Sequence, residues 1–134
     1  MDKSLRILVV DDERDILDTL DYSLALRGFE VVTAADGLEA LELAKQVKPE
    51  AMLLDVMLPG CNGYEVSRLL KEWMETDPHA ESFPIVLLTA RKVDSPEREK
   101  FIATWSRADR TLYKPFDIDE VIDHIEELAG AVPA

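Results

Sequence analysis

The sequence predicts an α/β fold in which a five-stranded, doubly wound parallel sheet is covered by helices on both faces. Five short segments typical of strands alternate along the chain with five segments of helical periodicity. The first, third and fourth of these segments are almost free of polar residues, as expected of strands buried on both sides, and helical crossovers connect the strands. These observations favour right-handed crossovers and the flavodoxin-like strand order 2-1-3-4-5.

Turn residues or charged residues mark the ends of the predicted strands. Only Arg6 interrupts the first run, Gly28 precedes the second, and Pro49 precedes the third. Pro84 opens the fourth run, and the fifth ends at Lys114. The strands cover residues 5–10, 29–33, 51–54, 84–89 and 110–113.

The predicted helices begin at residues that satisfy their first backbone N–H groups. Asn62 is a suitable N-cap for the third helix, and Ser95 followed by Pro96 starts the fourth. Asp117 or Asp119 caps the fifth. With a loop over residues 75–83, the helices cover residues 13–27, 36–48, 62–74, 95–106 and 117–128.

Apolar residues at helical spacing indicate which helix faces point inward. On this basis Leu69 in the third helix and the pair Phe101 and Trp105 in the fourth are predicted core residues. His79 and His124 fall in polar surroundings without a metal-binding partner at helical spacing, so both are predicted at the surface.

The composition describes a single acidic domain of 134 residues. No apolar run approaches the ~20 residues of a membrane span, and the start, Met1-Asp2-Lys3-Ser4, does not resemble a signal peptide. A net charge of -13 argues against direct nucleic-acid binding, which requires a basic surface. The single cysteine, Cys61, excludes an internal disulfide and fits the reducing conditions of the cytoplasm.

Chemically active side chains stand at the ends of four of the five strands. Asp11 and Asp12 follow the first strand, Asp55 follows the third, Thr89 ends the fourth, and Lys114 follows the fifth. In the predicted strand order the carboxyl ends of these strands lie together, where open α/β sheets bind their ligands. The sequence therefore predicts one pocket that holds three carboxylates, a hydroxyl and an ammonium group.

The three carboxylates of this pocket repel one another, so either one is protonated or a cation neutralises them. Oxygen ligands favour a hard cation, Mg²⁺ or Mn²⁺, which Asp11 and Asp12 are suited to bind. A lysine and a hydroxyl suit an anion, and the whole set is typical of phosphoryl transfer onto a carboxylate. Asp55, alone on the central strand before a Pro-Gly turn, is the candidate acceptor. The simpler alternative is that Asp55 only caps that turn.

Two other functions, a metal-dependent phosphatase and a nucleotide-binding module, are alternatives for this pocket. A metal-dependent phosphatase with an aspartate nucleophile needs a second acid two residues later, where this chain has Met57. A nucleotide-binding module needs a glycine-rich turn after its first strand, where this chain has three acids that would repel a pyrophosphate. Both alternatives are therefore disfavoured.

Four short motifs resemble those of receiver domains of two-component response regulators. They occur in the family's order and at near-family spacing, and the resemblance implies a single receiver domain over residues 1–134 with its core at 5–128. The motifs are Asp11-Asp12-Glu13, Asp55-Val56-Met57-Leu58-Pro59-Gly60-Cys61-Asn62-Gly63, Leu88-Thr89-Ala90 and Lys114-Pro115-Phe116-Asp117.

The resemblance implies that Asp55 accepts a phosphoryl group from a phosphohistidine of a sensor histidine kinase or a histidine phosphotransfer protein. It also implies an Mg²⁺ ion that binds Asp12 and Asp55 directly, Asp11 largely through water, and the backbone carbonyl of Met57. We expect Met57 and Arg91, which each follow a site residue by two positions, to flank the phosphoryl group and to slow its hydrolysis.

The resemblance also implies roles after phosphorylation. Lys114 pairs with Asp55 and then with the phosphoryl oxygens, Thr89 moves to hydrogen-bond the group, and the Lys114–Pro115 peptide bond is cis. The protein is then a signalling domain that assists its own phosphorylation and dephosphorylation, not an enzyme. The implied output face, formed by the fourth helix, fifth strand and fifth helix, is also a candidate for homodimer formation. The output partner is not identified, because the chain fits either a stand-alone receiver or one cut from a longer regulator.

Three departures from the family's pattern concern the readout of phosphorylation. Thr111 occupies the position of the family's aromatic switch residue, and Tyr113 is the nearest aromatic on the same strand face. The usual Gly-Ala-Asp before the fifth strand is Arg107-Ala108-Asp109, and extra residues fall within 91–95. We expect the readout to shift to that longer loop. A receiver that binds partners without phosphorylation is a further alternative, which the complete set of site residues disfavours.

Overall fold

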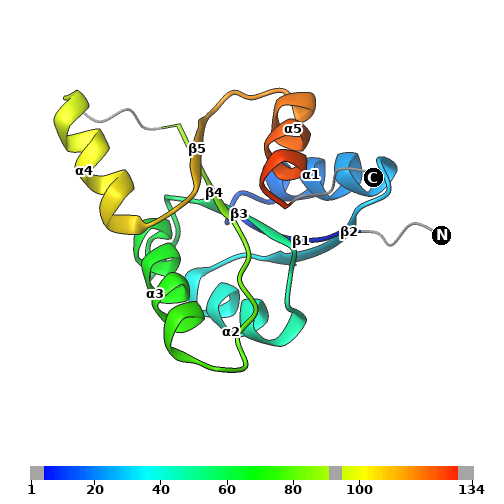
Figure 1. The fold of residues 1–134 in the computed structure, drawn as a ribbon. Helices are drawn as coiled ribbons and strands as arrows, with labels where there is room; N and C mark the ends of the chain where they lie inside the picture. Colours follow the sequence, from blue (N-terminus) through cyan, green and yellow to red (C-terminus); the bar gives the residue numbers. More distant parts are fainter. Residues whose placement is uncertain (1–4, 91–94, 130–134) are drawn as a thin grey trace.

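The computed structural model describes residues 5–90 and 95–129, and it contains the predicted sheet with helices on both of its faces (Figure 1). The five strands are parallel and follow the order β2-β1-β3-β4-β5, which confirms the predicted order. Within the described residues, no helix is both long enough and apolar enough to cross a membrane. The strands are β1 (Arg6–Val10), β2 (Glu30–Ala34), β3 (Ala51–Asp55), β4 (Ile85–Thr89) and β5 (Arg110–Tyr113). The helices are α1 (Arg14–Leu26), α2 (Gly37–Val47), α3 (Gly63–Thr76), α4 (Pro96–Ser106) and α5 (Ile118–Ala129).

The central strand β3 lies between β1 and β4, and all residues of β3 and β4 are buried. Its last residue, Asp55, pairs in register with Leu88, one residue before the end of β4. Helices α1 and α5 cover one face of the sheet, while α2 and α3 cover the other, each pair over its own apolar cluster (Figure 1). The sheet therefore carries Asp55 to its edge on a strand that is held from both sides.

The helix starts agree largely with the sequence. Asn62 caps α3 and forms a capping box, and Ser95 caps α4. Helix α5 begins directly after Asp117, one of the two predicted caps. Helix α3 continues to Thr76, beyond its predicted end, because the first helix-breaking residue, Pro78, comes later in the chain.

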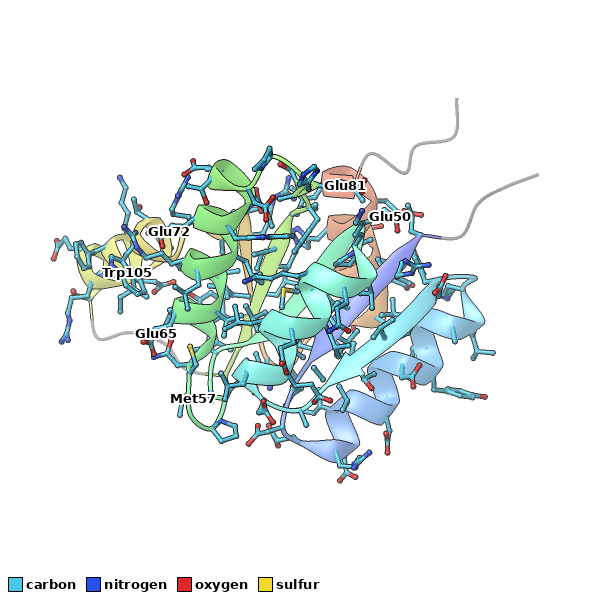
Figure 2. The ribbon with its side chains drawn as sticks, turned by 90° about the horizontal axis from the view of Figure 1, so that it is seen from below. Glu50, Met57, Glu65, Glu72, Glu81 and Trp105 are labelled. Atoms are coloured by element: carbon cyan, nitrogen blue, oxygen red, sulfur yellow. The ribbon has the colours of Figure 1, made fainter. Side chains whose placement is uncertain are left out.

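Helix α4 lies beside α3, away from the centre of the sheet (Figure 1). Phe101 is 67% exposed and Trp105 is 39% exposed, so the prediction that both lie in the core is wrong. Figure 2 shows Trp105 on the outer side of the molecule, where the guanidinium of Arg68 stacks on its ring at 5.1 Å. The prediction for Leu69 is also wrong, since 46% of its surface is exposed. Helical spacing identifies an apolar face, but that face reaches the core only where the helix packs across the sheet.

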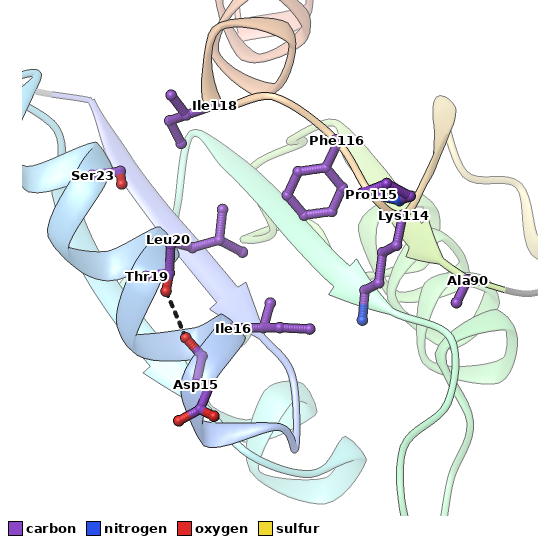
Figure 3. Close-up of a pocket in the computed structure, with 10 residues that line it drawn as sticks. All are labelled: Asp15, Ile16, Thr19, Leu20, Ser23, Ala90, Lys114, Pro115, Phe116 and Ile118. Carbon is purple, nitrogen blue, oxygen red and sulfur yellow. Dashed lines mark hydrogen bonds between the residues drawn. The ribbon is translucent and has the colours of Figure 1, made fainter.

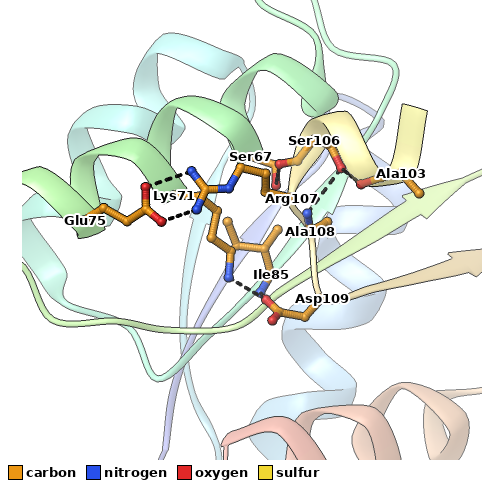
Figure 4. Close-up of polar contacts among 9 residues, drawn as sticks. All are labelled: Ser67, Lys71, Glu75, Ile85, Ala103, Ser106, Arg107, Ala108 and Asp109. Carbon is orange, nitrogen blue, oxygen red and sulfur yellow. Dashed lines mark hydrogen bonds and ion pairs between the residues drawn. The ribbon is translucent and has the colours of Figure 1, made fainter. Parts of the chain in front are cut away.

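Polar contacts join the C-terminal end of α4 to α3 (Figure 4). The hydroxyl of Ser67 donates a hydrogen bond to the carbonyl of Ser106 at 2.8 Å. The guanidinium of Arg107 pairs with both carboxylate oxygens of Glu75. Arg107 is the C-cap of α4 and has a φ of 62°, the left-handed conformation in which many helices end.

Candidate functional site

Charged side chains from the ends of β1, β3 and β5 lie together at one edge of the sheet. Asp11 follows β1 and is fully buried, Asp55 ends β3 with 2% of its surface exposed, and Asp12 is exposed beside them. Lys114 follows β5 and extends toward the carboxyl end of β3 (Figure 3). Thr89, at the end of β4, is 1% exposed, and its carbonyl accepts a hydrogen bond from the backbone of Lys114 at 2.8 Å. The structure thus brings the five residues selected from the sequence to the same edge.

The ammonium group of Lys114 lies among carboxylates. Its Nζ atom is 3.2 Å from Asp11 Oδ2, 3.4 Å from Asp55 Oδ1 and 3.6 Å from Glu13 Oε1. Burial lowers the pKa of Lys114, but the attraction of Asp55 and Asp11 outweighs this effect, so the pKa lies above its ordinary value. Lys114 therefore stays charged and neutralises part of the acidic pocket. The Lys114–Pro115 bond is cis, which confirms the expectation.

The carboxyl group of Asp55 is strongly affected by its surroundings. Burial, and then the negative charge of Asp11, raise the pKa of Asp55 from 3.8 to about 6. Lys114 and a hydrogen bond from the backbone N–H of Met57, 3.4 Å from Oδ1, act in the opposite direction. At pH 7 most molecules therefore carry an ionised Asp55, as a nucleophilic carboxylate requires. The raised pKa also means that the folded chain loses free energy by holding this charge.

Two glycines shape the loop that follows Asp55. Gly60 has a φ of 77°, a conformation that residues with a side chain seldom adopt. At Gly63 a Cβ atom would lie 2.3 Å from the carbonyl oxygen of Asp55, so no side chain fits where α3 begins. The tight loop leaves Met57 at the rim of the pocket, with 56% of its surface exposed. Figure 2 shows Met57 and Glu50 beyond opposite ends of β3.

The three aspartates of the pocket could hold a divalent cation. One carboxylate oxygen from each of Asp11, Asp12 and Asp55 lies within 4.8 Å of the other two. Mg²⁺ and Mn²⁺ favour such oxygen ligands, whereas structural Zn²⁺ sites are built mainly from Cys and His. The donor set therefore fits the cation expected from the sequence.

An open hollow of about 530 Å³ lies over Asp55. Its walls include Asp12, Glu13, Met57, Asn62 and Lys114. Glu13, for which the sequence predicts no role, lies 3.6 Å from Lys114. Its place directly after two site acids and before a helix, where glutamate is not a preferred N-cap, is the signal that could have identified it.

A second groove, of about 540 Å³, runs beside Lys114 between α1 and the start of α5 (Figure 3). Ile16 and Leu20 line it from α1, and Phe116 and Ile118 line it from the opposite side. An apolar surface thus borders the charged pocket.

The switch position predicted from the sequence lies near a third hollow. Thr111 and Tyr113 lie on the same face of β5, as expected, and both line a space of about 450 Å³ between β5, α4 and the start of α3. Thr111 is too small to fill this space. Arg91 and the rest of residues 91–94 lie outside the described residues, so the expected place of Arg91 beside the phosphoryl group stays a prediction.

Comparison with known proteins relates the chain to one family. The model of the response regulator receiver domain matches residues 7–126. The chain is 39% identical to the response regulator MprA of Mycobacterium ulcerans over 125 residues, which are 93% of the chain and 50% of MprA. It is 41% identical to the alkaline phosphatase synthesis transcriptional regulatory protein PhoP of Bacillus subtilis over 116 residues, which are 87% of the chain and 45% of PhoP. The chain thus spans about half the length of the curated relatives it matches.

Solved structures agree with this relation. The chemotaxis protein CheY4 of Vibrio cholerae superposes with a TM-score of 0.80 at 28% identity, over 94% of this chain and 99% of that one. The receiver domain of the sensor histidine kinase PA1611 of Pseudomonas aeruginosa gives a TM-score of 0.81 at 26% identity, over 96% and 99% of the two chains. That structure is described with a magnesium ion coordinated in its active site cleft.

Proposed function

The chain belongs to the family of response regulator receiver domains, and on that premise we propose that Asp55 is the residue that accepts the phosphoryl group. Phosphorylation on an aspartate is the general function of this family in two-component signalling. The observation that carries the proposal is the place of Asp55, a buried carboxylate at the end of the central strand. Lys114 lies 3.4 Å from it, and two further aspartates lie beside it.

The proposed reaction transfers a phosphoryl group from a phosphohistidine to Asp55. A carboxylate oxygen of Asp55 attacks the phosphorus, the P–N bond breaks, and the imidazole nitrogen leaves with the electron pair of that bond. A pKa of about 6 leaves Asp55 ionised and nucleophilic at pH 7. Water later attacks the phosphorus, which releases phosphate and restores the carboxylate. The domain thus assists its own phosphorylation and dephosphorylation and does not act as an enzyme on a separate substrate.

Asp11, Asp12 and Asp55, with the backbone carbonyl of Met57, would hold Mg²⁺, or Mn²⁺ in its place. The cation supplies positive charge that neutralises the carboxylates and the phosphoryl oxygens. Asp12 is exposed at the rim, which suits direct binding, whereas Asp11 contacts Lys114, which suits a contact through water. The magnesium described in the receiver domain of PA1611 supports this assignment.

Lys114 and Thr89 would bind the phosphoryl group on Asp55. Lys114 contacts Asp55 already and offers N–H donors to a phosphoryl oxygen. Thr89 ends the neighbouring strand, one residue beyond the in-register partner of Asp55, and its hydroxyl would be drawn toward the new charge. The displacement of Thr89 is the proposed first step of the signal.

The proposed phosphodonor is a sensor histidine kinase or a histidine phosphotransfer protein. The apolar groove between α1 and the start of α5 (Figure 3) borders Lys114, so a donor helix docked there would bring its phosphohistidine close to Asp55. This assignment places the protein in the cytoplasm, where a kinase phosphorylated from ATP supplies the group. The net charge of -13 opposes direct contact of this chain with nucleic acid.

The signal would be transmitted through the surface formed by α4, β5 and α5, where an output partner would bind. The proposed receivers of the signal are a partner protein, a second copy of the chain, or an output domain in a longer regulator. Relatives such as PhoP, which is named a transcriptional regulatory protein and extends well beyond the matched region, support the last possibility.

Phosphorylation by a small donor tests the proposed function. Acetyl phosphate with Mg²⁺ should add one phosphoryl group to the wild-type protein, and base and hydroxylamine should release it, as expected of an acyl phosphate. Asp55→Asn should abolish the mass increase, while Asp18→Asn, which removes an exposed aspartate of α1, should leave it intact. A stable label in Asp55→Asn, or a label on serine or histidine, would refute the assignment.

A further inference from the structure

Three carboxylates hold Lys114, and one of them has no part in the proposed function. The Nζ atom lies 3.2 Å from Asp11, 3.4 Å from Asp55 and 3.6 Å from Glu13. The contacts with Asp11 and Asp55 are hydrogen bonds, whereas the contact with Glu13, at 3.6 Å, is an ion pair without a hydrogen bond. A phosphoryl oxygen on Asp55 would be a further partner. If Lys114 moves toward that oxygen, the weakest of its present contacts should lengthen first.

Glu13 occupies the N-cap position of α1, yet its side chain makes no capping hydrogen bond. Residues preferred at this position have short side chains that reach the N–H groups of the first turn. The longer side chain of Glu13 extends instead to Lys114 and lines the hollow over Asp55. The side chain of Glu13 thus contacts the pocket and does not cap the helix.

Burial decides which contact of Lys114 is the easiest to give up. The side chain of Asp11 is 0% exposed, so without the lysine it would be a buried charge with one partner fewer. The side chain of Glu13 is 63% exposed, and water replaces the lysine there at little cost. Lys114 should therefore leave Glu13 and keep its contact with Asp11.

We propose that Glu13 is a positioning residue, which holds Lys114 at the mouth of the acidic pocket and releases it when a phosphoryl group is bound to Asp55. The inference rests on the proposed function, because it requires Asp55 as the phosphoacceptor. The attraction between Glu13 and Lys114 favours the unphosphorylated state. The negative charge of Glu13 also opposes the charge of about −1.5 to −2 that a phosphoryl group brings. Both effects raise the free energy of the phosphorylated state relative to the unphosphorylated one.

The substitution Glu13→Gln tests this role, because it removes the charge and keeps the size of the side chain. It should increase the affinity for beryllium fluoride, a phosphoryl mimic, by about 1.5- to 5-fold, the range that one exposed ion pair supports. The affinity is measured by titration at saturating Mg²⁺, with amide resonances near Asp55 as the signal. The Nζ resonance of Lys114, recorded without the mimic, should also shift in Glu13→Gln.

Asp18→Asn is the matched control, because it removes the same charge from the exposed side of α1. It should change neither the affinity nor the Lys114 resonance. A Glu13→Gln affinity equal to or below that of the wild type overturns the inference, as does an equal increase in Asp18→Asn. A purely structural role of Glu13 would lower the affinity, so an increase distinguishes the two. If the wild type itself fails to bind the mimic, the assignment of Asp55 as phosphoacceptor fails instead.

Discussion

Replacing Asp55 by asparagine should stabilise the protein at neutral pH when no divalent cation is present. The carboxylate of Asp55 is buried beside Asp11, and Lys114 offsets only part of the resulting loss of free energy, since the pKa of Asp55 stays raised, at about 6. Asparagine has nearly the same shape and cannot ionise. The variant therefore removes this unfavourable charge without leaving a cavity.

The pKa of Asp55 sets the size and the pH range of this effect. Its ordinary value is 3.8 and its folded value is about 6, and a difference of about 2 pH units corresponds to about 3 kcal/mol. Because the folded state holds the proton more tightly than the unfolded state, the free energy of unfolding of the wild type decreases as the pH rises from about 4 to about 6. Asp55→Asn lacks this decrease. The attraction of Lys114 is already included in this pKa, so we expect a net gain of up to about 3 kcal/mol above pH 7 and little gain near pH 4.

Urea denaturation in the presence of a chelator such as EDTA measures the difference in the free energy of unfolding between Asp55→Asn and the wild type. The measurements are made at about pH 4 and at about pH 7.5, on either side of the range in which Asp55 titrates. Asp18→Asn serves as the control, because it removes an exposed charge and should show no such dependence on pH. In saturating Mg²⁺ at pH 7.5 the wild type should instead be more stable than Asp55→Asn, because the wild type gains stability by binding the cation. The reasoning is wrong if the free energies of unfolding of Asp55→Asn and the wild type differ by the same amount at both pH values.

Three further predictions concern the metal, the lifetime and the readout. Asp12→Ala, which removes one of the three clustered carboxylates, should be more stable than the wild type without metal and should lose most of the rise in thermal midpoint with millimolar Mg²⁺; an equal response to Mg²⁺ contradicts the metal site. Met57→Asn should shorten the lifetime of the phosphorylated protein, measured as phosphate release, because an amide at the rim can orient the attacking water where the thioether cannot; a longer lifetime disproves the shielding role. Beryllium fluoride with Mg²⁺ should cause its largest amide shifts outside the pocket in residues 90–98, whereas dominant changes around Thr111 would show that β5 still carries the signal.

The sheet and the edge that carries the site follow from local patterns in the sequence. A strand buried on both faces is an apolar run, and the first charged residue after that run marks its carboxyl end, as Asp11 and Asp55 do. Once the strand order is known, the charged ends of β1, β3 and β5 must meet at one edge. The convergence on Asp55 could therefore be predicted without any knowledge of side-chain contacts.

The parts that could not be predicted depend on contacts between residues far apart in the chain. Whether Phe101 and Trp105 are buried depends on where α4 packs, and Arg68 of α3 supplies the surface on which the Trp105 ring lies. The ion pair of Arg107 joins it to Glu75, which lies 32 residues earlier in the sequence. The contact of Glu13 with Lys114 likewise joins the two ends of the domain. Spacing along the chain carries no information about such pairs.

Helix α4 is attached to α3 at one end and borders the hollow at Thr111 at the other. The carbonyl groups of Trp105 and Ser106 anchor the C-terminal end of α4 to α3. The N-terminal half of α4 lines the hollow instead, opposite Thr111 and Tyr113 of β5. A helix with so few buried side chains shifts at a smaller cost in free energy than a packed one does. A signal that begins at Thr89 should therefore move the start of α4 more readily than it reorients a side chain of β5.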